Sequence, residues 1–210
     1  MISTQEALDK LFSLVSVGAV EDVDLRRASG RVLATNVTAR RDQPPFAASA
    51  MDGYALISSE AIPGTRFSVI GEAAAGHAFS GALKSGQTVR IFTGAPLPDG
   101  ADRVVIQEDV HRDGDTITLG DNLDTKSHVR PARADFKAGD AIAAPKILTP
   151  SDIALLAAMN IPKIPVRRQP TIAIIATGDE LVQPGEDPSP DQIIASNSFG
   201  LDALVEATGS

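Results

Sequence analysis

The stretch Pro44-Pro45-Phe46-Ala47-Ala48-Ser49-Ala50-Met51-Asp52-Gly53-Tyr54 lies where the sequence changes from one kind of structure to another. The residues before it predict a helix over 4–15 and an extended segment over 32–37, whereas residues 54–128 form short apolar runs separated by Gly, Pro and Asp. Two prolines fix φ and remove backbone donors, so they end the extended segment. The stretch therefore predicts a boundary near Pro44, followed by a small β domain.

Two helices are predicted on either side of this β domain. Ser3-x-x-Glu6 is a capping-box pattern, and apolar residues at helical spacing follow it up to Val15. At residues 149–152, Thr149 can cap a second helix, Pro150 suits its first position and Asp152 favours its dipole. That helix should run to about Met159, with Asn160 left-handed beyond it. We expect residues 1–47 and 138–167 to form one discontinuous, elongated helical and extended domain.

The inserted domain, residues 48–137, is predicted to be β-rich. Its apolar runs are Arg66 to Ile70, Thr88 to Phe92, Arg103 to Gln107 and Thr116 to Leu119. Asp113-Gly114 precedes the last of these runs and predicts a short hairpin connection.

The last segment, residues 168–210, predicts the incomplete start of an α/β domain. Residues 171–176 form a continuous apolar run, which is typical of a strand buried on both faces of a parallel sheet. Ser196 or Asn197 can cap a following helix, which Gly209 would end. Because one strand and one helix cannot cover both faces of a sheet, we expect the chain to be a fragment with an α+β, multidomain architecture.

Composition excludes several classes of function. The 210 residues include no cysteine and no tryptophan, 4% are aromatic, and the formal net charge is −8. These values exclude disulfides and thiolate chemistry and argue against nucleic acid or anionic lipid as a partner. The N-terminus has no leader pattern and no segment has the apolar length to span a membrane, so a cytoplasmic protein is expected.

Asp52 is the first candidate for chemistry. Asp52-Gly53 could be another hairpin turn or a hinge between domains. The segment before Asp52 is uncharged, however, and its small residues would let the backbone come close to a ligand. This segment is Phe46-Ala47-Ala48-Ser49-Ala50-Met51. A lone carboxylate in such a loop is a reasonable metal ligand or base for a site that handles an anionic small molecule.

Three other segments could contribute polar groups. Residues 92–98 would present Thr93 and backbone N–H groups to an oxyanion, or they form only a rigid loop. Residues 130–135 carry Arg130, Arg133 and Asp135, which suit an oxyanion but alone read as a solvated cluster. Residues 177–180, with adjacent carboxylates, would lie at the carboxyl end of the predicted parallel strand, where Mg²⁺ could bridge a phosphate.

Several motifs occur in one order along the chain. They are Pro45-Phe46, Ser49-Ala50-Met51-Asp52-Gly53-Tyr54-Ala55, Thr93-Gly94-Ala95-Pro96-Leu97-Pro98, Gly100-Ala101-Asp102, Val104-Val105, Val129-Arg130, Asp135, Gly139, Thr177-Gly178-Asp179-Glu180-Leu181, Pro184-Gly185 and Ser196-Asn197. In this order they resemble the N-terminal half of the molybdopterin molybdenumtransferases, the MoeA family, which includes the E domain of gephyrin. The similarity covers essentially the whole chain.

The resemblance implies an enzyme that inserts molybdenum from molybdate into adenylylated molybdopterin and releases AMP, with Mg²⁺ assisting. It implies a homodimer whose cleft lies between the β domain of one subunit and the α/β domain of the other. It assigns catalysis to Asp52, Thr93 and Glu180, and metal binding to Glu180 and Asp52. Substrate binding falls to five residues: Ser49, Arg130, Asp135, Gly178 and Asp179.

One departure from the family pattern leaves alternatives open. Ala134 stands where the family usually has a carboxylate, in Arg133-Ala134-Asp135 instead of Gly-Glu-Asp. This difference motivates a second hypothesis, a non-catalytic dimerising scaffold or ligand-binding relative of the same fold. A third, more remote hypothesis is a nucleotide-binding α/β enzyme with an unrelated β insert.

Overall fold

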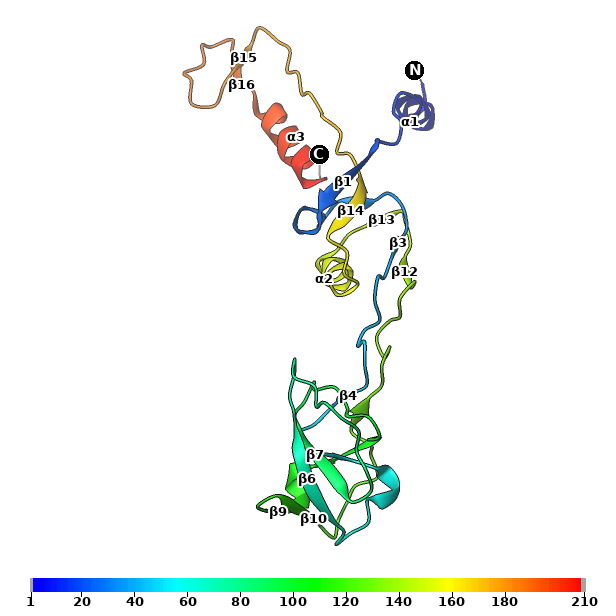
Figure 1. Ribbon diagram of the computed structural model, residues 1–210. Helices are drawn as coiled ribbons and strands as arrows, with labels where there is room; N and C mark the ends of the chain where they lie inside the picture. Colours follow the sequence, from blue (N-terminus) through cyan, green and yellow to red (C-terminus); the bar gives the residue numbers. More distant parts are fainter. Residues whose placement is uncertain (1, 209–210) are drawn as a thin grey trace. The chain divides into compact units, whose positions relative to one another are not determined.

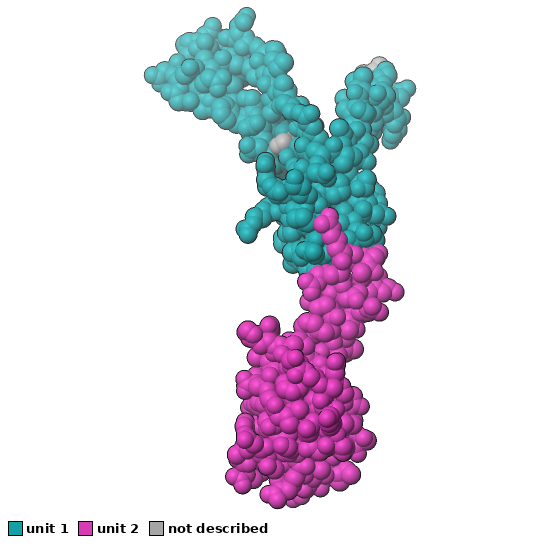
Figure 2. Space-filling model, viewed as in Figure 1, with its two compact units in different colours: residues 1–38, 141–210 teal, residues 39–140 magenta. Residues whose placement is uncertain are grey.

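The computed structural model describes residues 2–208, and its contacts group the chain into two compact units. Unit 1 combines residues 1–38 with 141–210, and unit 2 is the single segment 39–140. Figure 2 colours unit 1 teal and unit 2 magenta. Unit 2 is therefore inserted in the sequence of unit 1. The finer domain boundaries at 47/48, 137/138 and 167/168 stay predictions.

Both helices predicted in unit 1 form, with the predicted caps. Helix α1 spans Thr4–Ser13, and the side chains and backbone of Ser3 and Glu6 make both capping-box hydrogen bonds. Helix α2 spans Pro150–Ala158, and Thr149 and Asp152 make the same reciprocal pair. Asn160 has φ 64°, as predicted for a residue past the helix end. The two helices differ in burial, because α1 buries no residue whereas α2 buries Leu156 completely.

A four-stranded sheet forms the centre of unit 1 (Figure 1). Its order is β1 (Val20–Asp24), β14 (Lys163–Arg167), β2 (Val32–Leu33) and β13 (Lys146–Ile147). The 3-10 turn η1 (Leu25–Arg27) follows β1, and β3 (Val37–Thr38) pairs with β12 (Ala141–Ile142). The extended segment expected over residues 32–37 is thus split between β2 and β3. Leu33, Ile164 and Val166 are fully buried and form part of the core of this unit.

Unit 2 is built on a six-stranded sheet. The order is β8 (Arg103–Ile106), β5 (Gly53–Leu56), β7 (Gln87–Ile91), β6 (Arg66–Ala73), β10 (Thr116–Leu119) and β9 (Val110–Asp113). Only β6 and β7 run parallel; the other neighbours are antiparallel. The four predicted apolar runs are all strands, and Asp113 pairs with Thr116 across the predicted turn, where Gly114 has φ 57°. Two 3-10 turns, η2 (Ser58–Glu60) and η3 (Gln107–Asp109), and the short pair β4 (Ala48–Ser49) and β11 (Val129–Arg130) complete the unit.

Side chains on the two faces of this sheet form two separate clusters. Successive residues of a strand point to opposite faces, and in β5 Tyr54 and Leu56 belong to one cluster whereas Ala55 belongs to the other. Phe67 and Ile117 fill the first cluster, and both are almost fully buried. A sheet covered on both faces explains why unit 2 has a large apolar core without an α-helix.

The prediction for residues 171–176 is wrong. They form no strand, and Ile172 and Ile175 are 48% and 81% exposed. The described residues that follow provide only a two-stranded parallel pair, β15 (Leu181–Val182) with β16 (Ile193–Ile194), and helix α3 (Ser196–Ala207). An apolar run becomes a buried strand only when neighbours cover it, and no strand among these residues pairs with it.

The predicted cap of α3 is also wrong. The cap residue is Ala195, which makes no side-chain cap, and Ser196 is the first helical residue. The predicted end at Gly209 lies outside the described residues. The fold as a whole is mixed α/β. Within residues 2–208, no helix combines the length and the apolar character needed to cross a membrane.

Candidate functional site

Asp52 and Thr93 are in direct contact in unit 2. The Thr93 backbone N–H and its hydroxyl both donate to Asp52 Oδ1, at 2.8 and 2.9 Å. The contact arises because β5 follows Asp52 and β7 ends just before Thr93, and these strands pair with Gly53 opposite Ile91. Two residues 41 positions apart in the sequence are thus brought together by the register of one strand pair.

The same contacts set the ionisation of Asp52. The backbone N–H of Thr93 is the main cause that lowers the pKa of Asp52 below its ordinary value, followed by the Thr93 hydroxyl and, more weakly, by the charge of Arg90. Hydrogen bonds to a carboxylate favour its charged form. Asp52 is therefore an anion at neutral pH. In this structure Thr93 directs both donors at Asp52 rather than at an external oxyanion.

Ser49 fixes the loop that leads to Asp52. Its side chain is buried, its hydroxyl donates to the Met51 carbonyl at 2.5 Å, and its backbone bonds to Gly94 and Ala95. These bonds join the loop before Asp52 to the loop after Thr93. In this structure the Ser49 hydroxyl therefore acts on the backbone of its own loop.

Arg130 and Asp135 also meet within unit 2. Arg130 Nη2 donates to Asp135 Oδ1 at 2.5 Å, and both side chains are substantially exposed, at 54% and 39%. Arg130 lies opposite Ala48 in the β4–β11 pair, next to Ser49. The backbone contacts of this pair therefore connect the basic residue to the loop that carries Asp52.

A second Arg–Asp pair also lies within unit 2. Arg133 Nε bonds Asp42 Oδ2 at 2.9 Å, and the Arg133 N–H donates to the Pro44 carbonyl. The Ala138 N–H, and then the Arg133 side chain, lower the pKa of Asp42. These bonds tie residues 133–138 to the segment before Pro44, so they give Arg133 a structural role in this region.

Gly178, Asp179 and Glu180 lie in unit 1 on an exposed turn. The Leu181 N–H donates to the Gly178 carbonyl, and the Ile193 N–H donates to the Glu180 carbonyl at 2.7 Å. Gly178 has φ 149°, and a Cβ there would lie 2.5 Å from Glu180 Oε2. Glycine is therefore favoured at 178 by its backbone conformation, whereas the exposed Glu180 side chain could move away from a Cβ.

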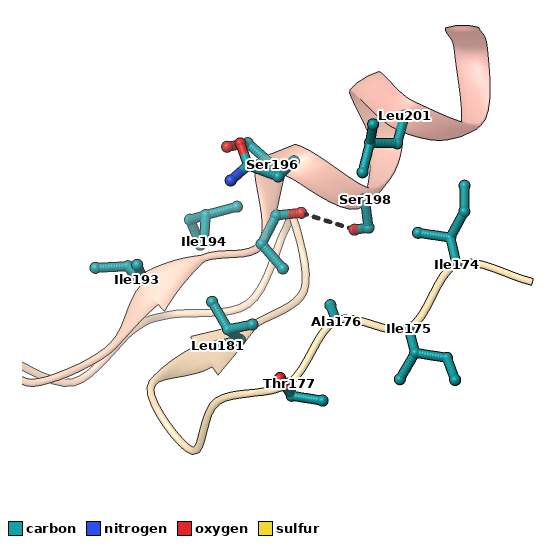
Figure 3. A pocket seen from close by; sticks show the side chains of 12 residues that line it. Ile174, Ile175, Ala176, Thr177, Leu181, Ile193, Ile194, Ser196, Ser198 and Leu201 are labelled. Carbon is teal, nitrogen blue, oxygen red and sulfur yellow. Dashed lines mark hydrogen bonds between the residues drawn. The ribbon is translucent and has the colours of Figure 1, made fainter. Parts of the chain in front are cut away.

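A pocket of about 260 Å³ lies next to this turn (Figure 3). Residues 174–177 border it on one side, and β16 with the start of α3 borders it on the other. Ser198 donates to the Ala195 carbonyl at its edge, as Figure 3 shows. The lining is mainly apolar and does not include Asp179 or Glu180. The pocket is thus separate from the carboxylates predicted to act in the site.

The described residues of the two units form no cluster of three or more metal-ligating side chains. Within residues 2–208, no group of three or more His, Asp or Glu side chains is arranged to hold an ion. Mg²⁺ commonly takes one or two carboxylates and completes its shell with water and substrate phosphates. Asp52 and Glu180 fit that limited role, as single ligands for an ion whose other ligands are water and substrate.

The sequence prediction missed Arg90 and Gln107. Arg90 Nη1 donates to the Gly53 carbonyl at 3.1 Å, Arg90 Nη2 donates to Gln107 Oε1 at 2.5 Å, and the Gln107 N–H donates to the Asp52 carbonyl at 3.1 Å. The sequence does contain one sign of a special role for Arg90, which is the one charged residue in the run 87–92. A charge within a strand that packs a core needs a partner.

The fold and these contacts define a class: a mixed α/β protein in which an inserted β unit carries a hydrogen-bonded carboxylate. Residues 2–160 match the family model described as the MoeA N-terminal region, domains I and II. The chain belongs to the MoeA family of molybdopterin biosynthesis proteins, which confirms the resemblance in the sequence.

Similar proteins agree with this assignment. The chain is 37% identical to a molybdopterin molybdenumtransferase of Nostoc sp. and 33% identical to one of Haemophilus influenzae, over 100% and 98% of its length. It covers 50% and 52% of these proteins, so it spans about half the length of the curated relatives it matches. The crystal structure of the molybdopterin biosynthesis MoeA protein from Pyrococcus horikosii matches the whole chain with a TM-score of 0.86 and 30% identity, over 55% of that structure.

Proposed function

We propose that this chain supplies part of the active site of a molybdopterin molybdenumtransferase. The complete protein would transfer molybdenum from molybdate to adenylylated molybdopterin and release AMP. The observation that carries the proposal is the Asp52–Thr93 contact. The family match over residues 2–160 supports it, because both residues lie within the matched range. Relatives of Nostoc and Haemophilus that bear the transferase name support the reaction.

The proposed residues suit an anionic substrate. Asp52 is an ionised carboxylate held at a fixed position by Thr93, so it can orient a metal ion or accept a proton. Arg130 offers a guanidinium that is half exposed beside the same loop, which suits the oxygens of molybdate or a phosphate. Ser49 and Asp135 would position these two groups. Gly178, Asp179 and Glu180 would contribute a second acidic loop to the reaction.

Mg²⁺ would be held by Asp52 or Glu180 together with water and substrate oxygens. When bound, it would neutralise negative charge on the phosphate and molybdate oxygens. We further propose that the complete protein is a cytoplasmic homodimer that acts on small molecules and binds neither nucleic acid nor membrane. The net charge of −8 supports the absence of a polyanionic partner.

The test is AMP release by the complete product of the gene, with adenylylated molybdopterin and molybdate as substrates. Asp52→Asn and Glu180→Gln should each lower kcat by about 10²-fold or more, since each removes a charge that acts on the reacting groups. Asp113→Asn in the hairpin turn and Glu206→Gln in α3 are matched controls on exposed residues and should keep wild-type rates. Unchanged rates in both Asp52→Asn and Glu180→Gln would refute the site.

The scaffold hypothesis is a second candidate because Ala134 replaces a carboxylate usual in the family. In this structure Asp135, beside Ala134, pairs with Arg130. A cell that lacks its own molybdenumtransferase separates the two hypotheses. Restored molybdoenzyme activity on expression of the complete gene supports the transferase, and a folded product without restored activity supports the scaffold.

A further inference from the structure

We propose that Arg90 is a positioning residue for this reaction, one that holds the Asp52–Gly53 and Phe92–Thr93 segments together from within the sheet. This inference rests on the proposed function only for its effect on turnover. The contacts themselves belong to the described residues of unit 2.

The Arg90 guanidinium lies over two aromatic rings. Its central carbon is 5.1 Å from the centroid of Tyr54 and 4.8 Å from that of Phe92. Tyr54 lies opposite Arg90 in the β5–β7 pair, two residues after Asp52, and Phe92 lies directly before Thr93. A guanidinium within about 6 Å of a ring centroid is attracted to that ring, so Arg90 makes a cation–π contact with each of them. Arg90 therefore contacts the chain segment on each side of the Asp52–Thr93 hydrogen bonds.

Two hydrogen bonds extend this contact to the backbone of Asp52. Arg90 reaches the Gly53 carbonyl with one Nη and the Gln107 side chain with the other. Gln107 in turn donates its own N–H to the Asp52 carbonyl. The Asp52 residue is thus held at its carboxylate by Thr93, at its carbonyl by Gln107, and at the next carbonyl by Arg90.

This arrangement requires a guanidinium rather than a positive charge alone. The two Nη groups diverge in a fixed plane, so one side chain can serve Gly53 and Gln107 while its face contacts Tyr54. A lysine ammonium is a point charge on a flexible stem and does not reproduce this geometry. Lysine at position 90 should therefore keep the charge but lose the alignment of Asp52 with Thr93.

The first test compares the kinetics of Arg90→Met and Arg90→Lys in the complete gene product. Arg90→Met should lower kcat by about 10²-fold, since small misplacements of a reacting group cost this much. KM should stay close to wild type if Arg90 acts, as proposed, by positioning the Asp52 segment. Arg90→Lys should lower kcat by about tenfold. Wild-type kcat in both variants, or full recovery in Arg90→Lys, would overturn the proposal.

Gln107→Leu covers the case in which Arg90 variants do not fold. Gln107 is exposed, so its loss should be tolerated, and it removes the acceptor that aligns Arg90. It should lower kcat without changing KM, and unchanged kcat would contradict the proposal. Arg66→Met, an exposed arginine of β6 in the same sheet, is the matched control and should leave kcat unchanged.

The second test does not depend on activity. In the chain labelled with ¹⁵N-threonine, the amide of Thr93 can be identified by its loss in Thr93→Ser. Arg90→Met should lower the ¹H chemical shift of this amide, as expected for a weaker hydrogen bond to Asp52, whereas Arg66→Met should leave it unchanged. An unshifted amide overturns the role of Arg90 whether or not the wild type releases AMP. If Arg90→Met shifts the Thr93 amide but the wild-type protein releases no AMP, the proposed function is refuted and the positioning role of Arg90 is not.

Discussion

Unit 2 and residues 171–208 present their candidate carboxylates in opposite ways. In unit 2 Asp52 is fixed by hydrogen bonds from Thr93, and it directly precedes β5 in a sheet whose two faces bury Leu56, Phe67 and Ile91 almost completely. Among residues 171–208 only Ala195 is buried, and Glu180 lies on an exposed turn. The difference shows that unit 2 sets the geometry of Asp52 by side-chain hydrogen bonds within a packed sheet, whereas Glu180 is held in an exposed turn by the backbone contact of its carbonyl with Ile193.

The largest predicted effect comes from a mutation in the packed core of unit 2. Phe67→Ala removes a ring that is 1% exposed and should lower the free energy of unfolding of unit 2 by about 3–5 kcal/mol. Ile175→Ala, at a side chain that is 81% exposed, should change stability by less than about 0.5 kcal/mol.

Tyrosine fluorescence and helical circular dichroism during urea unfolding together measure this difference. Tyr54 is the only tyrosine, the chain has no tryptophan, and Tyr54 is buried in the same cluster as Phe67, so its fluorescence measures the effect of Phe67→Ala on unit 2. Helical circular dichroism measures the effect of Ile175→Ala, because that residue and the described α-helices lie in unit 1. An equal loss of stability in Phe67→Ala and Ile175→Ala would contradict the contrast between the two regions.

A smaller effect concerns the helix caps of unit 1. The Lys146 ammonium, then the N–H and hydroxyl of Thr149, lower the pKa of Asp152 to about 2. Because the folded pKa lies below the unfolded one, the unfolded chain binds more protons as the pH falls. The stabilisation is complete above about pH 4 and is lost toward about pH 2. It amounts to about 1–2 kcal/mol, reduced by solvent around the half-exposed Lys146.

Urea unfolding followed by helical circular dichroism tests this pH dependence, since the three α-helices found within residues 2–208 all lie in unit 1. Asp152→Asn should be less stable than wild type at pH 6, and this difference should shrink as the pH falls to about 3. Helix α3, which has no side-chain cap, offers no comparable group. A difference between wild type and Asp152→Asn that stays constant over this pH range would contradict the assignment.

Gly200 and Gly53 should respond to alanine with opposite signs. Gly200 lies inside α3, and a Cβ there meets nothing within 4 Å, so Gly200→Ala should stabilise the helix by about 0.5–1 kcal/mol. A Cβ at Gly53 would lie 2.1 Å from the Val105 carbonyl, so Gly53→Ala must displace β5 from β8. Helical circular dichroism and Tyr54 fluorescence measure the two changes separately. Stabilisation in both variants would show that β5 tolerates a side chain at this position.

The sequence predicts local structure well and long-range geometry poorly. The capping pairs Ser3–Glu6 and Thr149–Asp152 and the left-handed Asn160 depend on neighbours within a few residues, so their patterns are sufficient. The strand expected over 171–176 fails because an apolar run does not specify the strands that must pair with it.

The candidate site shows the same division. Two separate sequence motifs predicted roles for Asp52 and Thr93. Their contact depends on the register of β5 with β7, which joins residues 41 positions apart. Arg90 reaches Gly53 and Gln107 over 37 and 17 positions. Such pairs become visible only when the order β8-β5-β7 is known.

The smallest predicted effect is a change in the pKa of Asp52 when Thr93 is replaced. Thr93→Val keeps the backbone N–H and removes the hydroxyl, which is the second cause of the lowered Asp52 pKa. The pKa of Asp52 should therefore rise part of the way to its ordinary value, whereas Thr93→Ser should leave it low. Carboxyl ¹³C NMR titration measures both. If Thr93→Val left the pKa unchanged, the backbone N–H alone would hold the carboxylate, and the hydroxyl of Thr93 would be available to a substrate.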